Sequence, residues 1–155
     1  VKTRDLHKQK YIMTLGVDAL SPNLSPQMIF EKISKSEVPI KQILLNQKLI
    51  AGIGNIYASE SLFLAGIRPA RLANRMTRAR YNDLATQVKK VLSCAIEAGG
   101  TTLRDFVNGQ GEPGYFQQTL TVYGRAGDPC KRCCHAIGSR VIAGRNSFFC
   151  PRCQT

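Results

Sequence analysis

The chain has 155 residues, of which 43% are hydrophobic, so it is long enough for one domain or two small ones with a modest core. Its formal net charge is +12, from 22 Lys and Arg against 10 Asp and Glu, which favours a polyanionic partner, either nucleic acid or an anionic membrane surface. No apolar run approaches the ~18 residues that a membrane span needs, and no N-terminal segment has the layout of a signal peptide, so the membrane alternative is the weaker one.

The first twenty residues are interpreted as the tail of an upstream domain with its linker. The chain opens VKTRDLHKQKYIMTLGVDALS without a methionine, and apolar residues such as Tyr11, Ile12 and Val17 have no partner strand nearby. The segment is too apolar for a disordered arm. Residues 1–20 are therefore set apart from a helical domain that we expect over residues 21–118.

Two short helices are predicted at the start of this helical domain. Ser25 is a good N-cap and Pro26 suits the first helical position, so the first helix is expected over about 26–35. The second helix is expected to begin near Pro39, and its apolar residues face inward.

Two further helices follow in the sequence. We expect Asn55 to cap the third helix, which runs through IYASESLFLAG and ends at Gly66. The fourth helix is the longest, starting after Thr77 and stopping at Gly99. Its apolar stripe consists of Leu84, Val88, Val91, Leu92 and Ala95.

Composition changes after Thr102. The stretch RDFVNGQGEPGYFQQ is rich in glycine, so we expect a mobile loop over about 101–116. From Thr119 the pattern in TLTVYGR predicts a strand, which opens a small β domain over residues 119–155. The expected fold class is therefore mainly α, with a small β hairpin at the C-terminus.

The cysteine pattern predicts a metal site in this β domain. Cys130 and Cys133 form one C-x-x-C pair and Cys150 and Cys153 form another, separated by 16 residues. Each pair places two thiolates on one side of a tight turn, and a hairpin between them closes a tetrahedron for one Zn²⁺. A segment this short has too little hydrophobic core of its own, so metal binding is expected to supply its folding energy.

Other cysteine assignments stay open beside the zinc site. Two disulfides or a redox C-x-x-C are the alternatives, but six cysteines without an export signal favour a reducing compartment. Cys134 could compete as a ligand, although a free thiol fits better, and His135 is expected at the surface. Cys94 is expected in the core, on the apolar face of the long helix.

The hairpin between the two cysteine pairs carries a basic tip. SRVIAGRNSFF is interpreted as two strands joined by Ala143-Gly144-Arg145-Asn146, a turn that projects Arg145 outward. From Arg125 to the end there are six Lys and Arg and only one acidic residue. A surface with one sign of charge is typical of phosphate docking, because a merely solvated face usually mixes both signs.

The stretch KLIAGIGN interrupts an apolar run with two glycines. Gly52 and Gly54 would let a ligand approach the backbone, and the following helix start would offer free N–H donors to a phosphate. Asn55 could add an amide donor and Lys48 a positive charge. An ordinary packing turn, in which the glycines only let two helices come close, is equally compatible with the local chemistry.

Several stretches together resemble one family. NQKLIAGIGNIYASESLFLAGIRP resembles the helix–two-turns–helix motif of the formamidopyrimidine-DNA glycosylases and their endonuclease VIII-like relatives. GGTTLRDF, GEPGYFQQTLTVYGRAGDPC and the four-cysteine hairpin resemble the same family in the same order. The resemblance covers nearly the whole chain, most specifically residues 38–69 and 99–153. The segments GEPGYFQ and TLTVYGR favour the branch that excises oxidised purines over the endonuclease VIII-like branch for oxidised pyrimidines.

The resemblance implies a role for individual residues. Lys48 and Asn55, with Gly54 beside them, match the family's grip on the phosphates that flank the lesion. Arg145 matches the hairpin arginine that contacts phosphate and helps to bend the duplex. The loop that closes over the flipped base is matched by Asn108, Gly111, Gly114 and Tyr115. The ligands of one structural zinc are matched by Cys130, Cys133, Cys150 and Cys153.

Two further features have weaker counterparts in the family. Tyr123 fits a position that supports the base of the hairpin, and an ordinary strand aromatic is the alternative. A basic cluster outside the motifs is expected to be peripheral and mostly solvated; it consists of Arg68, Arg71, Arg75, Arg78 and Arg80.

The resemblance also implies a mechanism. A family enzyme flips the damaged nucleotide out of the stack, and the amine of an N-terminal proline attacks C1′ of the sugar, with the next residue, a glutamate, as acid and base. This chain begins Val1-Lys2-Thr3. We therefore expect a glycosylase and AP lyase in the intact protein, and no catalysis by this chain alone.

The implied setting is base-excision repair in the bacterial cytoplasm. The expected partner is duplex DNA with oxidised purines (8-oxoguanine, formamidopyrimidines) or abasic sites, bound by a nucleoid-associated monomer. Two alternatives remain, a non-catalytic DNA-binding zinc-finger module and an RNA-binding zinc ribbon of the translation apparatus. The second is disfavoured by the Gly52–Asn55 motif and by the few aromatics suited to stacking on single-stranded bases.

Overall fold

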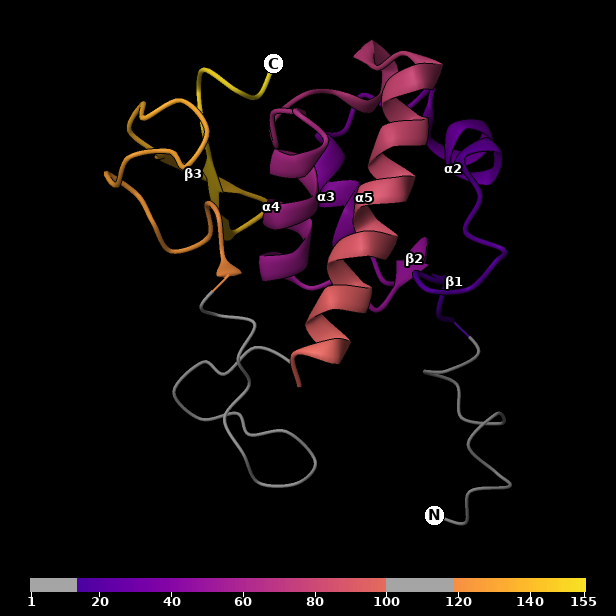
Figure 1. The fold of residues 1–155 in the computed structure, drawn as a ribbon. Coiled ribbons are helices and arrows are strands. Elements are labelled where there is room, and N and C mark those ends of the chain that lie inside the picture. The colour runs from indigo at the N-terminus through magenta and orange to yellow at the C-terminus, as the bar shows by residue number, and fades with distance from the viewer. Residues whose placement is uncertain (1–13, 100–118) are drawn as a thin grey trace.

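The computed structural model describes residues 14–99 and 119–155 (Figure 1). The loop residues Asn108, Gly111, Gly114 and Tyr115, and most of the N-terminal segment, lie outside the described residues. In chain order the elements are β1 (Val17–Asp18), α2 (Pro26–Ile33), α3 (Ile40–Leu44), β2 (Ile50–Ala51), α4 (Asn55–Leu64), the 3-10 turn η2 (Ala73–Arg75), α5 (Arg78–Glu97), β3 (Gly138–Ile142) and β4 (Arg145–Phe149).

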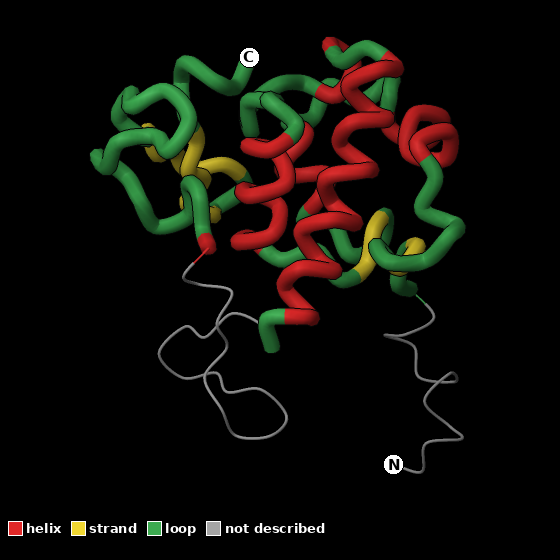
Figure 2. Tube along the Cα trace, viewed as in Figure 1, coloured by secondary structure: helices red, strands yellow, loops and turns green. Residues whose placement is uncertain are grey.

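Residues 14–99 form a helical body, and residues 127–155 form a zinc hairpin beside it. In Figure 1, α4 lies between the hairpin and α5, while α2 lies on the far side of α5. Figure 2 shows how the helices gather on one side of the molecule and loops dominate the other. The predicted mainly α fold with a small β hairpin is confirmed. None of the described helices is long and apolar enough to cross a membrane.

Local capping chemistry explains where the helices begin and end. The Ser25 hydroxyl accepts a hydrogen bond from the Met28 N–H at 3.1 Å, and Pro26 occupies the first turn of α2. The Thr77 hydroxyl accepts from the Arg80 N–H at the start of α5. Gly66 follows α4 in the left-handed conformation (φ +67°). These predicted helix ends are confirmed.

The apolar stripes of the helices are buried, most of them in one large core, while Val91 and Ala95 of α5 pack with Leu120 in a smaller cluster. The five stripe residues predicted on α5 are all buried, as are Ile40, Ile43 and Leu44 on α3. Tyr81 is fully buried in the large core, and its hydroxyl donates to the Ala73 carbonyl at 2.8 Å. Because a buried phenolate would lack solvation, burial raises the pKa of Tyr81 to about 12.

A short parallel ladder ties the segment before residue 20 to the helical body. Val17, which the sequence left without a partner strand, pairs with Ile50. The Gly16 N–H donates to the Gln47 carbonyl at 2.8 Å, and a Cβ at Gly16 would lie 2.3 Å from the Leu49 backbone. Only glycine fits there, so residues 16–19 pack as part of the helical body rather than as a free tail.

The zinc hairpin has the predicted antiparallel strands and a tighter turn than expected. β3 and β4 pair from Gly138↔Phe149 to Ile142↔Arg145. The two linking residues, Ala143 (φ +51°) and Gly144 (φ +72°), are both left-handed, as in a two-residue hairpin turn. Arg145 is therefore the first residue of β4, and its side chain is exposed at the tip.

The strand predicted at TLTVYGR is wrong, because residues 119–125 contain no strand. The backbone N–H groups of Thr121, Val122 and Tyr123 donate to the buried carboxylate of Glu60, at 2.8, 3.0 and 2.9 Å. The Thr121 hydroxyl donates to the same carboxylate. These donors are the ones that a sheet ladder would use, so a single side chain from α4 replaces a partner strand.

Candidate nucleic-acid interface and metal centre

The four predicted zinc ligands meet in one cluster. The Sγ atoms of Cys130, Cys133, Cys150 and Cys153 all lie within 4.8 Å of one another. The distance is 3.9 Å between the Cys130 and Cys153 sulfurs and 3.5 Å between the Cys133 and Cys150 sulfurs. Zinc bound by four thiolates at about 2.3 Å requires sulfurs about 3.8 Å apart, so the cluster fits a tetrahedral Zn²⁺.

Burial makes two of the four thiols resist ionisation on their own. Burial is the main cause that raises the pKa of the Cys150 and Cys153 thiols, to about 12 for Cys153, and neighbouring thiols add to the effect for both. At Cys130 burial acts in the same direction, but the N–H groups of Arg132 and Cys133 outweigh it and lower the pKa to about 7. Four thiolates form together only around a bound metal ion.

Cys134 and His135 lie outside the cluster. The Cys134 N–H donates to the Cys130 carbonyl at 2.9 Å, and Cys134 takes a positive φ of +60°. This conformation, which a glycine would adopt more easily, turns the Cys134 side chain away, and it is exposed together with His135. The expectation of a free thiol at Cys134 and a surface histidine is confirmed.

Arginines from both parts join the zinc hairpin to the helical body. Arg68 donates to the Pro151 carbonyl at 2.8 Å and lies over the Phe149 ring. Arg80 donates to the Thr155 carbonyl at 2.9 Å. From the hairpin side, the Arg132 guanidinium lies 4.5 Å from the centroid of the Phe63 ring. Arg68 and Arg80 thus make structural contacts that the sequence did not predict, while Arg68, Arg75 and Arg78 are exposed as expected for the basic cluster.

Tyr123 packs where the resemblance placed it, against the hairpin. Its ring meets the Phe148 ring of β4 edge-on, with centroids 5.0 Å apart. The backbone of Tyr123 is held by Glu60, as described above. The tyrosine therefore braces the hairpin from an irregular segment and not from a strand.

The glycine corner, Gly52 to Asn55, links β2 to α4. Gly52 is left-handed (φ +94°), and Gly54 is the N-cap of α4, so Asn55 is the first helical residue and not the cap expected from the sequence. A Cβ built on either glycine would meet nothing within 4 Å. The glycines therefore face open space, which disfavours the interpretation of the corner as a close-packed turn between helices.

Arg145 of the zinc hairpin reaches this corner. A hollow of about 410 Å³ is lined by Leu45, Gln47, Gly52, Ile53, Gly54, Asn55 and Arg145. The Gln47 side chain fixes the corner, because its oxygen accepts from the Gly52 N–H and its nitrogen donates to the Ile53 carbonyl, both at 2.9 Å. The hollow thus combines a helix N-terminus with a cation from a segment distant in sequence.

Asn55 connects the two sides of the hollow. Its amide nitrogen donates to the Asn146 carbonyl at 3.1 Å, across 91 positions of the sequence. The Asn55 oxygen is buried without a hydrogen-bond partner among the described residues. Asn55 therefore joins the hairpin to the corner in addition to any contact with a ligand.

Lys48 is not among the residues that line the hollow. Its side chain is exposed, and its N–H donates to the Asn46 side chain at 3.0 Å in the turn after α3. The lysine that lies beneath the corner is Lys41 of α3, which sequence reasoning missed. Lys41 stands between buried Ile40 and Ile43 on a short apolar helix, and this placement was the only signal in the sequence.

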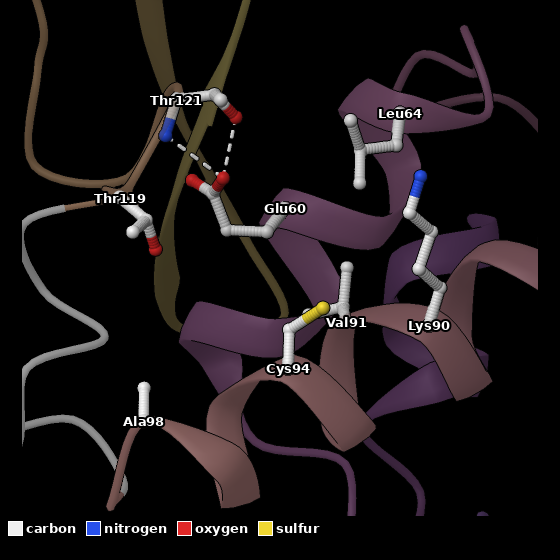
Figure 3. A pocket seen from close by; sticks show the side chains of 8 residues that line it. All are labelled: Glu60, Leu64, Lys90, Val91, Cys94, Ala98, Thr119 and Thr121. Atoms are coloured by element: carbon white, nitrogen blue, oxygen red, sulfur yellow. Dashed lines mark hydrogen bonds between the residues drawn. The ribbon is translucent and has the colours of Figure 1, made fainter.

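A second hollow lies between α4, α5 and the segment after residue 118 (Figure 3). Its volume is about 330 Å³, and its wall includes Glu60, Val91, Cys94 and Thr121. Figure 3 shows the Glu60 carboxylate turned to Thr121, so it is engaged by the backbone and not offered to a ligand. Cys94 is exposed at this wall, which corrects its expected place in the core.

Family models match both parts of the chain. The model described as "Formamidopyrimidine-DNA glycosylase H2TH domain" matches residues 15–107, which is more than half of the chain. The model described as "Zinc finger found in FPG and IleRS" matches residues 127–155. The four clustered cysteines are therefore the site of one structural zinc ion.

Similar proteins and structures agree with these matches. The chain is 49% identical over 140 residues to a formamidopyrimidine-DNA glycosylase from Hahella chejuensis, covering 90% of this chain and 52% of the relative. It is 44% identical over 152 residues to one from Pseudomonas fluorescens, covering 98% of this chain and 56% of the relative. The chain thus spans about half the length of the curated relatives it matches.

Two solved structures resemble the fold closely. The crystal structure of the MutM (Fpg) protein from Thermus thermophilus matches with a TM-score of 0.89 and 40% identity, over 97% of this chain and 57% of that chain. The complex between the Lactococcus lactis Fpg and an abasic site containing DNA matches with a TM-score of 0.89 and 33% identity, over 100% of this chain and 57% of that chain.

Proposed function

Because this chain belongs to the family of formamidopyrimidine-DNA glycosylases, we propose that it is the DNA-gripping half of a base-excision repair enzyme. Its role is to hold duplex DNA around a damaged or missing base. The observation that carries the proposal is the hollow in which Arg145 of the zinc hairpin faces the open glycine corner. A phosphate in this hollow would meet a guanidinium on one side and backbone N–H groups on the other.

The charge and shape of the chain support this role. A formal net charge of +12 suits a polyanion, and the hairpin tip is exposed on the same side as the corner. Phosphate contacts position a protein on DNA without reading sequence, as a repair protein requires. Gly54, Asn55 and Arg145 are the proposed contacts, and Lys48 is proposed as a peripheral charge that adds to the attraction.

The intact protein is proposed to be a glycosylase and AP lyase for oxidised purines such as 8-oxoguanine and formamidopyrimidines. Relatives of about twice this length carry the glycosylase name, and a solved neighbour is a complex with DNA that contains Fapy-dG. The proline amine and the glutamate of the chemistry would come from outside these 155 residues. The loop residues Asn108, Gly111, Gly114 and Tyr115 would close over the flipped base. The protein is proposed to act as a monomer in the bacterial cytoplasm.

Duplex binding tests the grip. The zinc-loaded chain is expected to bind a duplex with an abasic site more tightly than an intact duplex or single-stranded RNA, measured by fluorescence anisotropy. Arg145→Ala and Asn55→Ala should each weaken binding by about ten- to a hundredfold, since a charge-assisted contact contributes about 1.5–3 kcal/mol. Arg145→Ala should also flatten the dependence of affinity on salt. The exposed Arg75→Ala is the matched control, and equal effects from both arginines would remove the assignment of Arg145.

Borohydride trapping tests the division of labour. Reduction in the presence of abasic-site DNA captures the Schiff base of a lyase as a stable adduct. The 155-residue chain is expected to give no adduct, while the longer protein gives one. An adduct with the short chain would place the nucleophile within these residues and contradict the proposal.

A further inference from the structure

Lys41 is a buried cation at the joint between three elements. Its side chain is 0% exposed. The ammonium donates to the Ser59 hydroxyl of α4 at 3.0 Å, to the Ser147 hydroxyl of β4 at 2.8 Å and to the Asn146 carbonyl at 3.1 Å. One side chain of α3 thus uses all three of its donors to hold the helix start and the zinc hairpin together.

All three acceptors are neutral, so the charge of Lys41 has no anionic partner in the described parts of the chain. From β4 the charged group that faces it is Arg145, another cation. From α4 it meets Ser59, and the nearby Glu60 carboxylate is turned to the segment Thr121–Tyr123. Buried charges are usually paired, so an unpaired ammonium beneath a hollow for anions favours a counter-ion from outside.

We propose that Lys41 is the positioning residue that sets Arg145 against Asn55, and that a DNA phosphate bound at Arg145 supplies the counter-charge that Lys41 lacks, through its electric field and not by contact. This inference rests on the proposed function and adds a coupling to it. The affinity for the phosphates of DNA and the protonation of Lys41 are proposed to depend on each other.

The electrostatics of the free protein agree with this coupling. Burial, and next the positive charge of Arg145, lower the pKa of Lys41 from 10.5 to about 8. A phosphate at Arg145 would offset both causes and raise the pKa again. A group whose pKa is higher in the complex takes up a proton on binding, so affinity is full below about pH 8 and falls as pH rises above it.

Lys41→Met removes the charge and leaves no acceptor without a partner. The Ser59 hydroxyl still donates to the Asn55 carbonyl at 3.0 Å, and the Ser147 hydroxyl to the Arg145 carbonyl at 3.3 Å. The Asn146 carbonyl still accepts from Asn55. The variant is therefore expected to fold, because no buried group is left unpaired, and a thermal melt measures what the loss of the three hydrogen bonds costs.

The test measures affinity for an abasic-site duplex at about pH 7 and pH 9, at one ionic strength, with zinc-loaded protein. Wild type is expected to lose about tenfold more affinity than Lys41→Met over this interval, which is the factor for one pH unit above the free pKa. Lys35→Met, which removes an exposed lysine of the helical body, is expected to follow the wild-type profile.

The outcomes separate the inference from the proposed function. If Lys41→Met binds as tightly as wild type at pH 7, or loses affinity with pH to the same extent, the inference is overturned while the grip stands. If wild type shows no preference for the abasic duplex and Arg145→Ala changes nothing, the proposed function fails first.

A second measurement needs no variant. In protein labelled with ¹³C at lysine Cε, the Lys41 resonance is expected to titrate near pH 8 in the free chain. Adding the abasic duplex should move the midpoint up by about two pH units, which is the shift that the expected tenfold loss of affinity requires. A midpoint that does not move when the duplex binds overturns the coupling.

Discussion

The helical body and the zinc hairpin reach a fixed structure by different means. The helical body buries a continuous set of apolar residues from α2, α3, α4 and α5. The hairpin contributes Ile137 and two of its cysteines to a small cluster, and the other buried residues of that cluster are Phe63 of α4 and Val122. A core of this size does not fold a segment by itself, so the metal and the neighbouring helix take the place of hydrophobic mass.

The difference explains how the two parts divide a binding task. Backbone N–H groups at a glycine corner keep their direction because the helices behind them are packed. The tip of a hairpin needs a different restraint, since exposed Val141 (63% exposed) and Arg145 contribute nothing to a core. The zinc ion supplies this restraint at the end of the hairpin that carries the cysteines, and Lys41 supplies it nearer the tip, through Asn146 and Ser147.

Loss of the metal should separate the two parts most completely. Cys150→Ser, or removal of zinc by a chelator, is expected to unfold residues 127–155 while the far-ultraviolet signal of the helices persists. Structural zinc contributes on the order of 10 kcal/mol to such segments. Metal content and ¹H–¹⁵N spectra measure the effect. Cys134→Ser is the matched control, and a helical body that melted together with the hairpin would refute the division.

A cavity in the helical body should have the opposite effect. Leu84 of α5 is fully buried, so Leu84→Ala is expected to lower the free energy of unfolding of the helical body by about 2–5 kcal/mol. Zinc content under native conditions should not change. Urea denaturation followed by circular dichroism measures the loss. Val141→Ala at the exposed tip should change stability by less than about 0.5 kcal/mol.

Glu60→Gln tests the contact between α4 and residues 121–123, which lead into the zinc hairpin. The substitution removes a charge that accepts from three backbone N–H groups and one hydroxyl, so we expect a loss of about 1–3 kcal/mol. Hydrogen exchange at Thr121, Val122 and Tyr123 should speed up more than exchange in α5. Glu37→Gln, at an exposed position, is the control. Unchanged protection from exchange at the three amides would show that the contact between α4 and residues 121–123 does not depend on the carboxylate.

The smallest expected effect belongs to a helix cap. Ser25→Ala removes the acceptor for the Met28 N–H and should destabilise the helical body by about 1 kcal/mol. Ser93→Ala, at an exposed position within α5, should not destabilise it, since alanine favours a helix interior. A thermal melt of both variants makes the comparison, and equal shifts would mean that the cap is not what stabilises α2.

Features set by near neighbours in the sequence could be predicted, and those set by distant contacts could not. The caps at Ser25 and Thr77 and the end at Gly66 follow from residues within one helical turn. The two C-x-x-C pairs define their own turns, and pairing them needs only a hairpin. For this reason the helices and the zinc ligands were predicted correctly.

The failures share one cause. The segment TLTVYGR has the composition of a strand, but its backbone N–H groups donate to the Glu60 carboxylate, which lies 61 positions before Thr121. A lysine is usually expected at the surface, yet Lys41 is buried and donates a hydrogen bond to Ser147, 106 positions later. Cys94 lies on an apolar face whose edge is left open. No local pattern records which side chain a folded chain will bring alongside.

The Asn146 carbonyl, which accepts from both Lys41 and Asn55, sets the span between the two jaws of the hollow. Arg68 and Arg80 hold the zinc hairpin near its cysteine pairs, and the hydrogen bonds to the Asn146 carbonyl hold it near its tip. Under the proposed function, a hollow whose two sides are joined in this way would favour a duplex that bends to place its phosphates there. DNA that lacks a base bends at a lower energy cost than intact DNA. The protein would therefore recognise damage first through the flexibility of the duplex and only later through contacts with a base.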